Sequence, residues 1–249
     1  MLPLAEEKIW ITDHLLNVHP YRFFGLLGIS PHVLSLFVAS ALMLVIFPRI
    51  AKDQSLVPTG LRNFFEVILV FIRDEVARPF LGHNTERFLP VLWTFFFFIL
   101  FCNLLGLVPG MATATGQIWV TGTLAFTAAG WIHASGIWEQ GLLPYIKNIV
   151  PPGLPLALIP LLFVIEIFGH FFKPMALMIR LWANMTGGHA VLYGFLGLIF
   201  IFETYWVAPV SVAAAVGVYM LEIFVAFVQA YVFTFLVTVF LGSAVHPEH

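Results

Sequence analysis

Apolar runs long enough to approach the width of a membrane alternate with short polar connections along most of the chain. Residues 32–47 form the first run, which ends at Pro48 and can be lengthened by the apolar residues 23–29. Residues 89–108 form the second run, which ends at Pro109. Since about 20 apolar residues span the hydrocarbon core of a bilayer, both runs predict transmembrane helices.

The connection between these runs predicts a helix that lies on the membrane instead of crossing it. Its apolar stretch, residues 67–72, stands between Glu66 and Arg73 and is far too short to span a bilayer. At helical spacing, Arg62, Glu66 and Arg73 share one face. We therefore expect residues 61–77 to form an amphipathic helix in the membrane interface.

A third, weaker run, residues 119–138, is rich in Thr, Ala and Gly. Small residues favour close helix packing over lipid contact, so we expect this run to be a span that packs closely against other helices. A loop is expected over residues 139–153, where Pro144 and Pro151 stand.

The last apolar run continues nearly to the C-terminus, with a turn expected near Ala208 and Pro209. Its first part, residues 154–207, allows two interpretations. Two spans, 154–172 and 188–207, could flank a surface connector, which hydropathy slightly favours. Alternatively, one steeply tilted helix of about 80 Å could bury the connector at mid-membrane. The connector carries a single charge and good helix formers, which is unusual for a surface loop.

Composition adds several exclusions. Of the 249 residues, 61% are apolar and 10% are charged, against roughly a quarter charged in soluble domains. A soluble fold of this length could not cover so much apolar surface. A net charge of −2 excludes a strongly basic nucleic-acid-binding protein. The single cysteine, Cys102, excludes a disulfide framework or a cysteine metal cluster.

The basic residues predict the orientation of the chain. Six of the eleven lysines and arginines lie close together, at Arg49, Lys52, Arg62, Arg73, Arg78 and Arg87. Positively charged connections stay in the cytoplasm, which leaves the N-terminus outside and the C-terminus inside. The N-terminal segment has no continuous apolar core, so no cleaved signal peptide is expected.

Between Lys147 and the C-terminal tail, each ionisable residue stands among apolar neighbours. These residues are Glu166, His170, Lys173, Arg180, His189, Glu203 and Glu222. An ionisable group at bilayer depth costs about 2.5–3.5 kcal/mol even on lenient scales, so such groups mark a function or a partner.

Spacing places these residues on two helix faces. In one helix, a single arc of about 80° would hold Glu166, His170, Lys173, Arg180 and Asn184. A second face would hold Ser211, Ala215, Glu222, Ala226 and Gln229. Two helices with one polar face each can bury those faces against each other or against a third partner.

Ordinary structural roles are the alternative for the same residues. Glu166, His170 and Lys173 could form an ion-pair cluster, Arg180 could extend to lipid headgroups, and His189 could pack between helices. No spacing matches a zinc site, a nucleophile with its base, or a phosphate-binding loop, so no cofactor is expected.

Three stretches carry a resemblance to a known family. KPMALMIRLWANMTGGHAVL (173–192) resembles the signature of the F-type ATP synthase a subunit, in which an arginine, an asparagine four residues later, and a Gly followed by His or an acid occur together. YMLEIFVAFVQAYVFTFL (219–236) resembles the last helix of that family, and TFFFFILFCNLLGLVPG (94–110) resembles its Asn-Leu…Pro segment. Many bacterial members carry an acid at the position of His189 and a histidine at that of Glu222. The reversed pair, as in mitochondrial relatives, suggests that the two positions face each other.

The resemblance implies an all-α, polytopic membrane protein. It would have one transmembrane helix, an interfacial amphipathic helix, a transmembrane hairpin and two long tilted helices facing a ring of c subunits, with Arg180 buried against that ring. Residues 1–249 would form a single membrane domain. Its parts would be an outer N-terminal segment, a first span, a cytoplasmic connection, the hairpin and the long helix pair, at residues 1–31, 32–48, 49–88, 89–138 and 154–241.

The function implied is proton translocation by the stator of a rotary ATP synthase, with two half-channels kept apart by the permanent charge of Arg180. Ion translocation would rest on Arg180, Glu222, His189, Asn184, Gln229 and Glu166. Candidates for the channel lining are Asn103, His170, Lys173 and Glu203. The chain would not be catalytic alone. Its partners would be the c-subunit ring, peripheral-stalk b subunits, the lipid bilayer and the translocated proton, with no nucleic acid.

Some alternatives stay open at the level of sequence. Sodium could replace the proton, because the rotor carboxyl site sets that choice. A bacterial inner membrane is the expected location, and a mitochondrial inner membrane is the second. An ion-coupled secondary transporter could use Arg180 to bind an anionic substrate, although the two related halves typical of that class are absent. A purely structural membrane anchor would leave the intramembrane charges unexplained. Isolation together with a c ring would separate these functions.

Overall fold

The computed structural model of the chain describes residues 30–52, 60–108, 111–147, 159–202 and 206–245. Within these ranges the chain is almost entirely helical and contains no strand. Four of the described helical stretches are long and apolar enough to cross a membrane: Pro31–Ile50, Arg62–Leu107, Leu161–Ile199 and Val207–Val245. The predicted all-α, polytopic membrane protein is therefore confirmed.

The first helix, α2 (Pro31–Lys52), continues one turn past the predicted end at Pro48. A proline this close to a helix end removes only one backbone hydrogen bond. Arg49 and Lys52 then occupy the last turn, where the helix dipole favours positive charge. The helix therefore ends four residues beyond the predicted span 32–48, and the proposed extension over residues 23–29 lies outside the described residues.

The connection after α2 is helical, as predicted for residues 61–77, but it is not one regular helix. Helix α3 (Leu61–Phe71) passes into a π-helical turn (Ile72–Ala77) and then into α4 (Arg78–Leu81). Arg62 pairs with Glu66 at 3.7 Å, one helical turn away. Arg73, the second residue of the π-helical turn, pairs with its neighbour Asp74.

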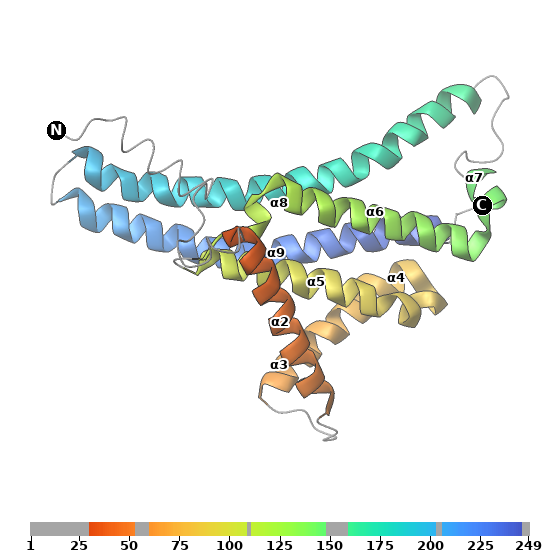
Figure 1. Cartoon of the computed structure of the whole chain (residues 1–249), viewed down its shortest axis with the longest axis horizontal. Coiled ribbons are helices and arrows are strands. Elements are labelled where there is room, and N and C mark those ends of the chain that lie inside the picture. The colour runs from red at the N-terminus through yellow and green to blue at the C-terminus, as the bar shows by residue number, and fades with distance from the viewer. Residues whose placement is uncertain (1–29, 53–59, 109–110, 148–158, 203–205, 246–249) are drawn as a thin grey trace. The chain divides into compact units, whose positions relative to one another are not determined.

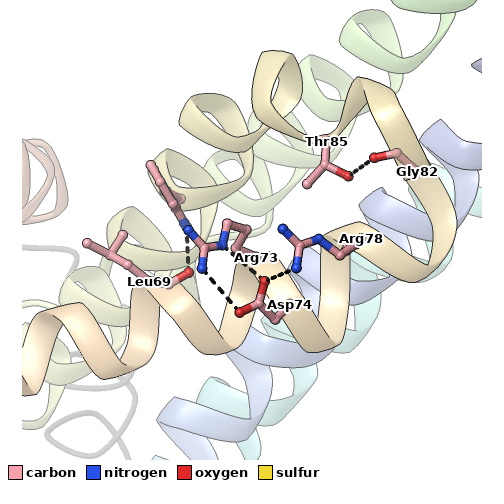
Figure 2. Close-up of polar contacts among 7 residues, drawn as sticks. Leu69, Arg73, Asp74, Arg78, Gly82 and Thr85 are labelled. Atoms are coloured by element: carbon pink, nitrogen blue, oxygen red, sulfur yellow. Dashed lines mark hydrogen bonds and ion pairs between the residues drawn. The ribbon is translucent and has the colours of Figure 1, made fainter.

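Asp74 forms ion pairs with both arginines that follow α3. Its carboxylate is 3.0 Å from Arg73 Nε and 3.0 Å from Arg78 Nη1 (Figure 2). The turn into the next helix is closed by Thr85 Oγ1, which donates to the Gly82 carbonyl at 2.6 Å, and Gly82 takes a positive φ of 51° that suits glycine. Trp93 donates its indole N–H to the Leu69 carbonyl at 3.2 Å and so fixes α5 to α3.

Both segments of the predicted hairpin are helical and form α5 (Thr85–Leu107) and α6 (Ile118–Gln140). With 23 residues, α6 is long enough to span a membrane, but it is less apolar than the four stretches named above. The loop expected after it was wrong in part, because Gly141, with φ of 84°, ends α6 and residues Leu142–Lys147 form a short helix, α7. Residues 148–158 lie outside the described ranges.

The last two helices are long and unbroken: α8 (Ile159–Phe202) has 44 residues and α9 (Val207–Val245) has 39 (Figure 1). The interpretation of residues 154–207 as two spans with a surface connector was therefore wrong. The connector is helical throughout and passes through Pro174. The turn expected near Ala208 and Pro209 lies earlier, at Trp206, because the first turn of a helix tolerates proline.

Two compact units make up the chain, and the long helices contribute to both. Unit 1 comprises Met1–Val45, Phe98–Val120 and Leu181–Gln229. Unit 2 comprises Ile46–Phe97, Thr121–Arg180 and Ala230–His249.

Aromatic packing dominates the described part of unit 2. Phe235 and Phe233 of α9 contact Phe80 of α4 and Phe95 of α5, with ring centroids 5.6 and 5.8 Å apart. Gly242 allows the close approach of these helices, since a Cβ there would lie 2.8 Å from the Phe80 carbonyl oxygen. The C-terminal part of α9 is thereby held on the connection and on α5.

Candidate functional site

Unit 1 holds a polar cluster between the second half of α8 and the first half of α9. These segments lie side by side in opposite directions (Figure 1). Asn184 Nδ2 is 3.5 Å from Gln229 Oε1, and His189 Nδ1 is 4.0 Å from Glu222 Oε1. Asn184 of the first predicted polar face therefore meets Gln229 of the second, and His189, which belonged to neither predicted face, lies near Glu222.

The imidazole of His189 lies between a hydroxyl and a carboxyl group. Thr113 Oγ1 is within hydrogen-bond distance of His189 Nε2, at 2.7 Å, and Glu222 stands on the Nδ1 side. The two ionisable side chains are only 14% and 9% exposed. Glu222 Oε2 has no hydrogen-bond partner among the described residues. A buried polar atom left without a partner is costly, so this oxygen stands out among the described side chains.

Thr113 is held in place by the start of α2. His32 Nδ1 is 3.1 Å from the Thr113 carbonyl oxygen, and Gln117 Nε2 is 2.9 Å from His32 Nε2. Ser35 donates its hydroxyl to the Ala112 carbonyl at 2.7 Å. In a neutral imidazole one nitrogen donates and the other accepts, and these contacts match His32 with the proton on Nδ1.

A second set of buried amides lies beside the first cluster. Asn103 is fully buried, donates to the Ala226 carbonyl at 3.4 Å and accepts from the Thr115 hydroxyl at 2.8 Å. Gln229 is also buried, and its Nε2 has no hydrogen-bond partner among the described residues. Asn103 thus joins α5 to α9, and Gln229 retains a free donor.

Gly188 makes room for the carboxyl group of Glu222. A Cβ at position 188 would lie 2.9 Å from Glu222 Cδ and 3.1 Å from Cγ, and it would overlap Oε1. The Glu222 side chain therefore packs directly on the α8 backbone, where any larger residue would displace it.

Gly188→Ala is expected to leave the fold intact and to displace the Glu222 carboxyl group from its place beside His189. The added methyl moves only the end of a flexible side chain, and alanine raises helix propensity by up to about 1 kcal/mol. The position of the carboxyl group in an experimental structure of the variant measures the effect. Gly194→Ala is the matched control, since its Cβ meets nothing within 4 Å, and it should leave Glu222 in place. A Glu222 side chain that occupies the same position in both variants would contradict the expected displacement.

Unit 2 holds a separate ionisable cluster on the first half of α8. Glu166 Oε1 is 3.6 Å from Lys173 Nζ and 3.8 Å from His170 Nδ1. His170 Nδ1 also lies 2.7 Å from the Glu166 carbonyl oxygen, one turn earlier. These are the contacts of the ion-pair interpretation made from the sequence.

A cavity of about 120 Å³ lies beside this cluster. Its polar lining includes Glu166, His170, Lys173, His133, Gln140 and Tyr145. His133 Nδ1 is 2.7 Å from the Tyr145 hydroxyl, and burial raises the pKa of that hydroxyl.

Comparison with known proteins assigns the family. The sequence model described as ATP synthase A chain matches residues 33–242. A protein of Chloroherpeton thalassium named ATP synthase subunit a is 43% identical over 270 aligned positions, which cover 98% of this chain and 79% of the relative.

The chain belongs to the ATP synthase A chain family.

Other members of the ATP synthase A chain family agree. A protein of Chlorobaculum tepidum named ATP synthase subunit a 2 is 43% identical over 264 positions, covering 96% of this chain and 74% of the relative. A protein of an Anaeromyxobacter species is 43% identical over 240 positions, covering 94% of this chain but only 59% of the relative. The resemblance read from the sequence is confirmed, and these relatives are bacterial.

Arg180 and Glu203 complete the predicted set for this family member. The side chain of Arg180 is exposed and makes no hydrogen bond or ion pair with the described residues. Its expected burial against a ring therefore stays a prediction. Glu203 lies outside the described residues. Within those residues, no group of three His, Cys, Asp or Glu side chains could hold a metal ion.

Thr113, His32 and His133 were not predicted as site residues. Thr113 lies in a polar string, ATATGQ (112–117), that reads as a simple connection. His32 reads as the first residue of a span. Only the fold brings Thr113 to His189, over a separation of 76 residues. In the same way, His32 reaches the Thr113 carbonyl and His133 reaches His170 only through packing between helices. The sequence signal that could have indicated Thr113 was the concentration of hydroxyl and amide side chains between two apolar runs.

Proposed function

We propose that the chain is the proton-translocating stator subunit of a rotary ATP synthase, and that it offers two offset half-channels to the carboxyl groups of a c-subunit ring. Arg180 separates the two paths. Peripheral-stalk b subunits and the lipid bilayer complete its surroundings, and the whole chain acts as one membrane domain. This proposal deepens the family assignment with a mechanism.

The observation that carries the proposal is the guanidinium of Arg180 on an apolar helix. Its neighbour Ile179 is 46% exposed, and little of the stretch Leu161–Ile199 is buried within the chain. A guanidinium keeps its charge in proteins, and such a charge at bilayer depth needs an anionic partner. A rotor carboxylate that loses its proton beside Arg180 supplies that partner.

The charge of Arg180 explains both how the rotor carboxyl gives up its proton at the stator and why protons do not leak between the two paths. An adjacent positive charge lowers the pKa of a carboxyl group, so a rotor carboxyl becomes ionised as it passes Arg180. Away from the stator, the same carboxyl faces lipid and must be neutral. The fixed charge also repels protons, so the two paths do not join into a leak.

The two polar clusters supply the two paths. With the basic connection in the cytoplasm, α8 runs outward and α9 runs inward. His189 and Glu222 then belong to the outer path, with Asn103 and Glu203 as further lining. Glu166, His170 and Lys173 lie on the cytoplasmic side of Arg180 in α8. The side-chain amides of Asn184 and Gln229 would then lie between the outer path and the cytoplasmic path.

The test is ATP-driven acidification of inverted membrane vesicles from cells that lack their own subunit of this family. Vesicles complemented with this chain should acidify, and vesicles with the empty vector should not. Acidification that is the same with and without the chain would contradict the proposal. Acidification that requires sodium would replace the proton by sodium as the carried ion.

The orientation gives a separate prediction. A cysteine in place of the exposed His83 should react with a membrane-impermeant thiol reagent in inverted vesicles and not in intact cells. The native Cys102 is fully buried and provides no background. Trp206→Cys is the matched control for the outer side, since Trp206 is 85% exposed at the start of α9. Labelling of the two sites from the opposite sides would reverse the topology and exchange the two half-channels.

A further inference from the structure

The cavity in unit 2 contains a pair of histidines from different helices. The rings of His133 in α6 and His170 in α8 stack with their centroids 5.0 Å apart and their planes 27° from parallel. His133 Nδ1 contacts the Tyr145 hydroxyl of α7 at 2.7 Å. Both histidines line the cavity, and so does Glu166.

The surrounding charges favour no more than one extra proton shared between His133 and His170. Lys173 lines the same cavity and is paired with Glu166 at 3.6 Å. A second positive charge on stacked rings 5.0 Å apart would repel the first and would also face Lys173. Among the cavity residues, the titratable groups that face His133 are His170, Glu166 and Lys173 of α8 and Tyr145 of α7, and α9 contributes none.

Other occupants fit this cavity less well. A metal ion is not favoured, because no group of three ligating side chains exists among the described residues. An anion is not favoured either, because the ammonium group of Lys173 already faces the Glu166 carboxylate and lies 5.3 Å from the centre of the Phe240 ring. Water and a proton suit a small polar cavity of about 120 Å³.

We propose that His133 and His170 form a proton-collecting pair that takes one proton at a time from cytoplasmic water and passes it toward Glu166 and the inner path. Each step moves a proton from water to an imidazole nitrogen and from imidazole to the next acceptor, with no other bond changed. The inference rests on the proposed function and adds His133, with Tyr145 as a positioning residue that orients its ring through Nδ1.

His133→Asn is the direct test. The asparagine amide can take the place of Nδ1 and keep a hydrogen bond to Tyr145, but it cannot carry a proton. The initial rate of ATP-driven acidification of inverted vesicles holding the complete complex is measured from about pH 6.5 to about pH 8.5 outside. We expect rates within about twofold of the parent at the acidic end. At the alkaline end, where protons are scarce, we expect a loss of about threefold to tenfold.

Two further measurements test whether the pH dependence of His133→Asn reflects a lost proton carrier. Added imidazole buffer should restore the alkaline rate of His133→Ala, because the vacated cavity admits a soluble proton carrier. Tyr145→Phe should give a weaker loss of the same pH dependence. A His133→Asn profile that matches the parent, or a loss that is equal at every pH, would overturn the inference. Arg180→Ala, assayed beside it, reports on the proposed function alone, so the two ideas can fail separately.

Discussion

Replacement of Arg180 by alanine is expected to abolish ATP-driven proton pumping and coupled ATP synthesis while the complex still assembles. The side chain makes no hydrogen bond or ion pair with the described residues, so its loss leaves none of their buried polar groups unsatisfied. The rotor carboxyl would lose the positive charge that favours its ionised form, and turnover would stop at that step. Passive proton leak is expected to rise, because the electrostatic barrier between the two paths has gone.

Two controls make the Arg180 result specific. Arg78→Ala removes another arginine whose side chain is 59% exposed, outside the proposed paths, and should pump normally. Arg180→Lys keeps a positive charge but loses the planar, permanently charged fork, and a large loss is still expected. Assembly is checked by the amount of complex recovered from the membrane. Coupled pumping at the parental rate by Arg180→Ala would remove the basis of the half-channel mechanism.

The second large effect concerns His189 and Glu222. Each single replacement, His189→Asn or Glu222→Gln, is expected to lower pumping by about 100-fold, the usual size of a lost acid–base group. In the structure the two groups lie 4.0 Å apart. Thr113 contacts His189, and the Glu222 side chain packs against Gly188. A proton can pass between an imidazole and a carboxylate at such a distance with one small adjustment or one water.

Exchange of the two residues separates a proton relay from simple helix packing. The double variant His189→Glu with Glu222→His keeps both titratable groups and should recover pumping to within about tenfold of the parent. The uncharged double variant, His189→Asn with Glu222→Gln, can keep a packing hydrogen bond but should not pump. If the uncharged pair pumps normally in a fully assembled complex, the two residues only hold α8 and α9 together.

The hydrophobic pattern was sufficient to predict the helices but not to predict where they end. The runs at 32–47 and 89–108 each became a helix, because length and apolarity decide membrane insertion. The helical state of residues 173–187 could not be decided from hydropathy, since one charge among helix formers suits a connector and a buried helix alike. The family resemblance favoured the single helix, and the structure confirms it.

The sequence indicated contacts within one helix more readily than contacts between helices. The proximity of Glu166, His170 and Lys173 follows from periodicity alone. Periodicity left open whether the two polar faces meet each other or a third partner, and the family resemblance suggested that His189 and Glu222 face each other. Thr113 and His133 come to their partners only through long-range packing, which periodicity does not report. The space that Gly188 leaves for Glu222 is likewise invisible in the sequence, because a glycine within a helix usually indicates flexibility or close packing of helices.

Isolation of the tagged chain from its native membranes in mild detergent tests the central claim most directly. The account predicts that c subunits accompany the chain in a ring, and that the isolated assembly pumps protons when it is reconstituted with ATP. A chain that is recovered alone, while an intact and active c-ring complex is isolated separately without it, would contradict the account.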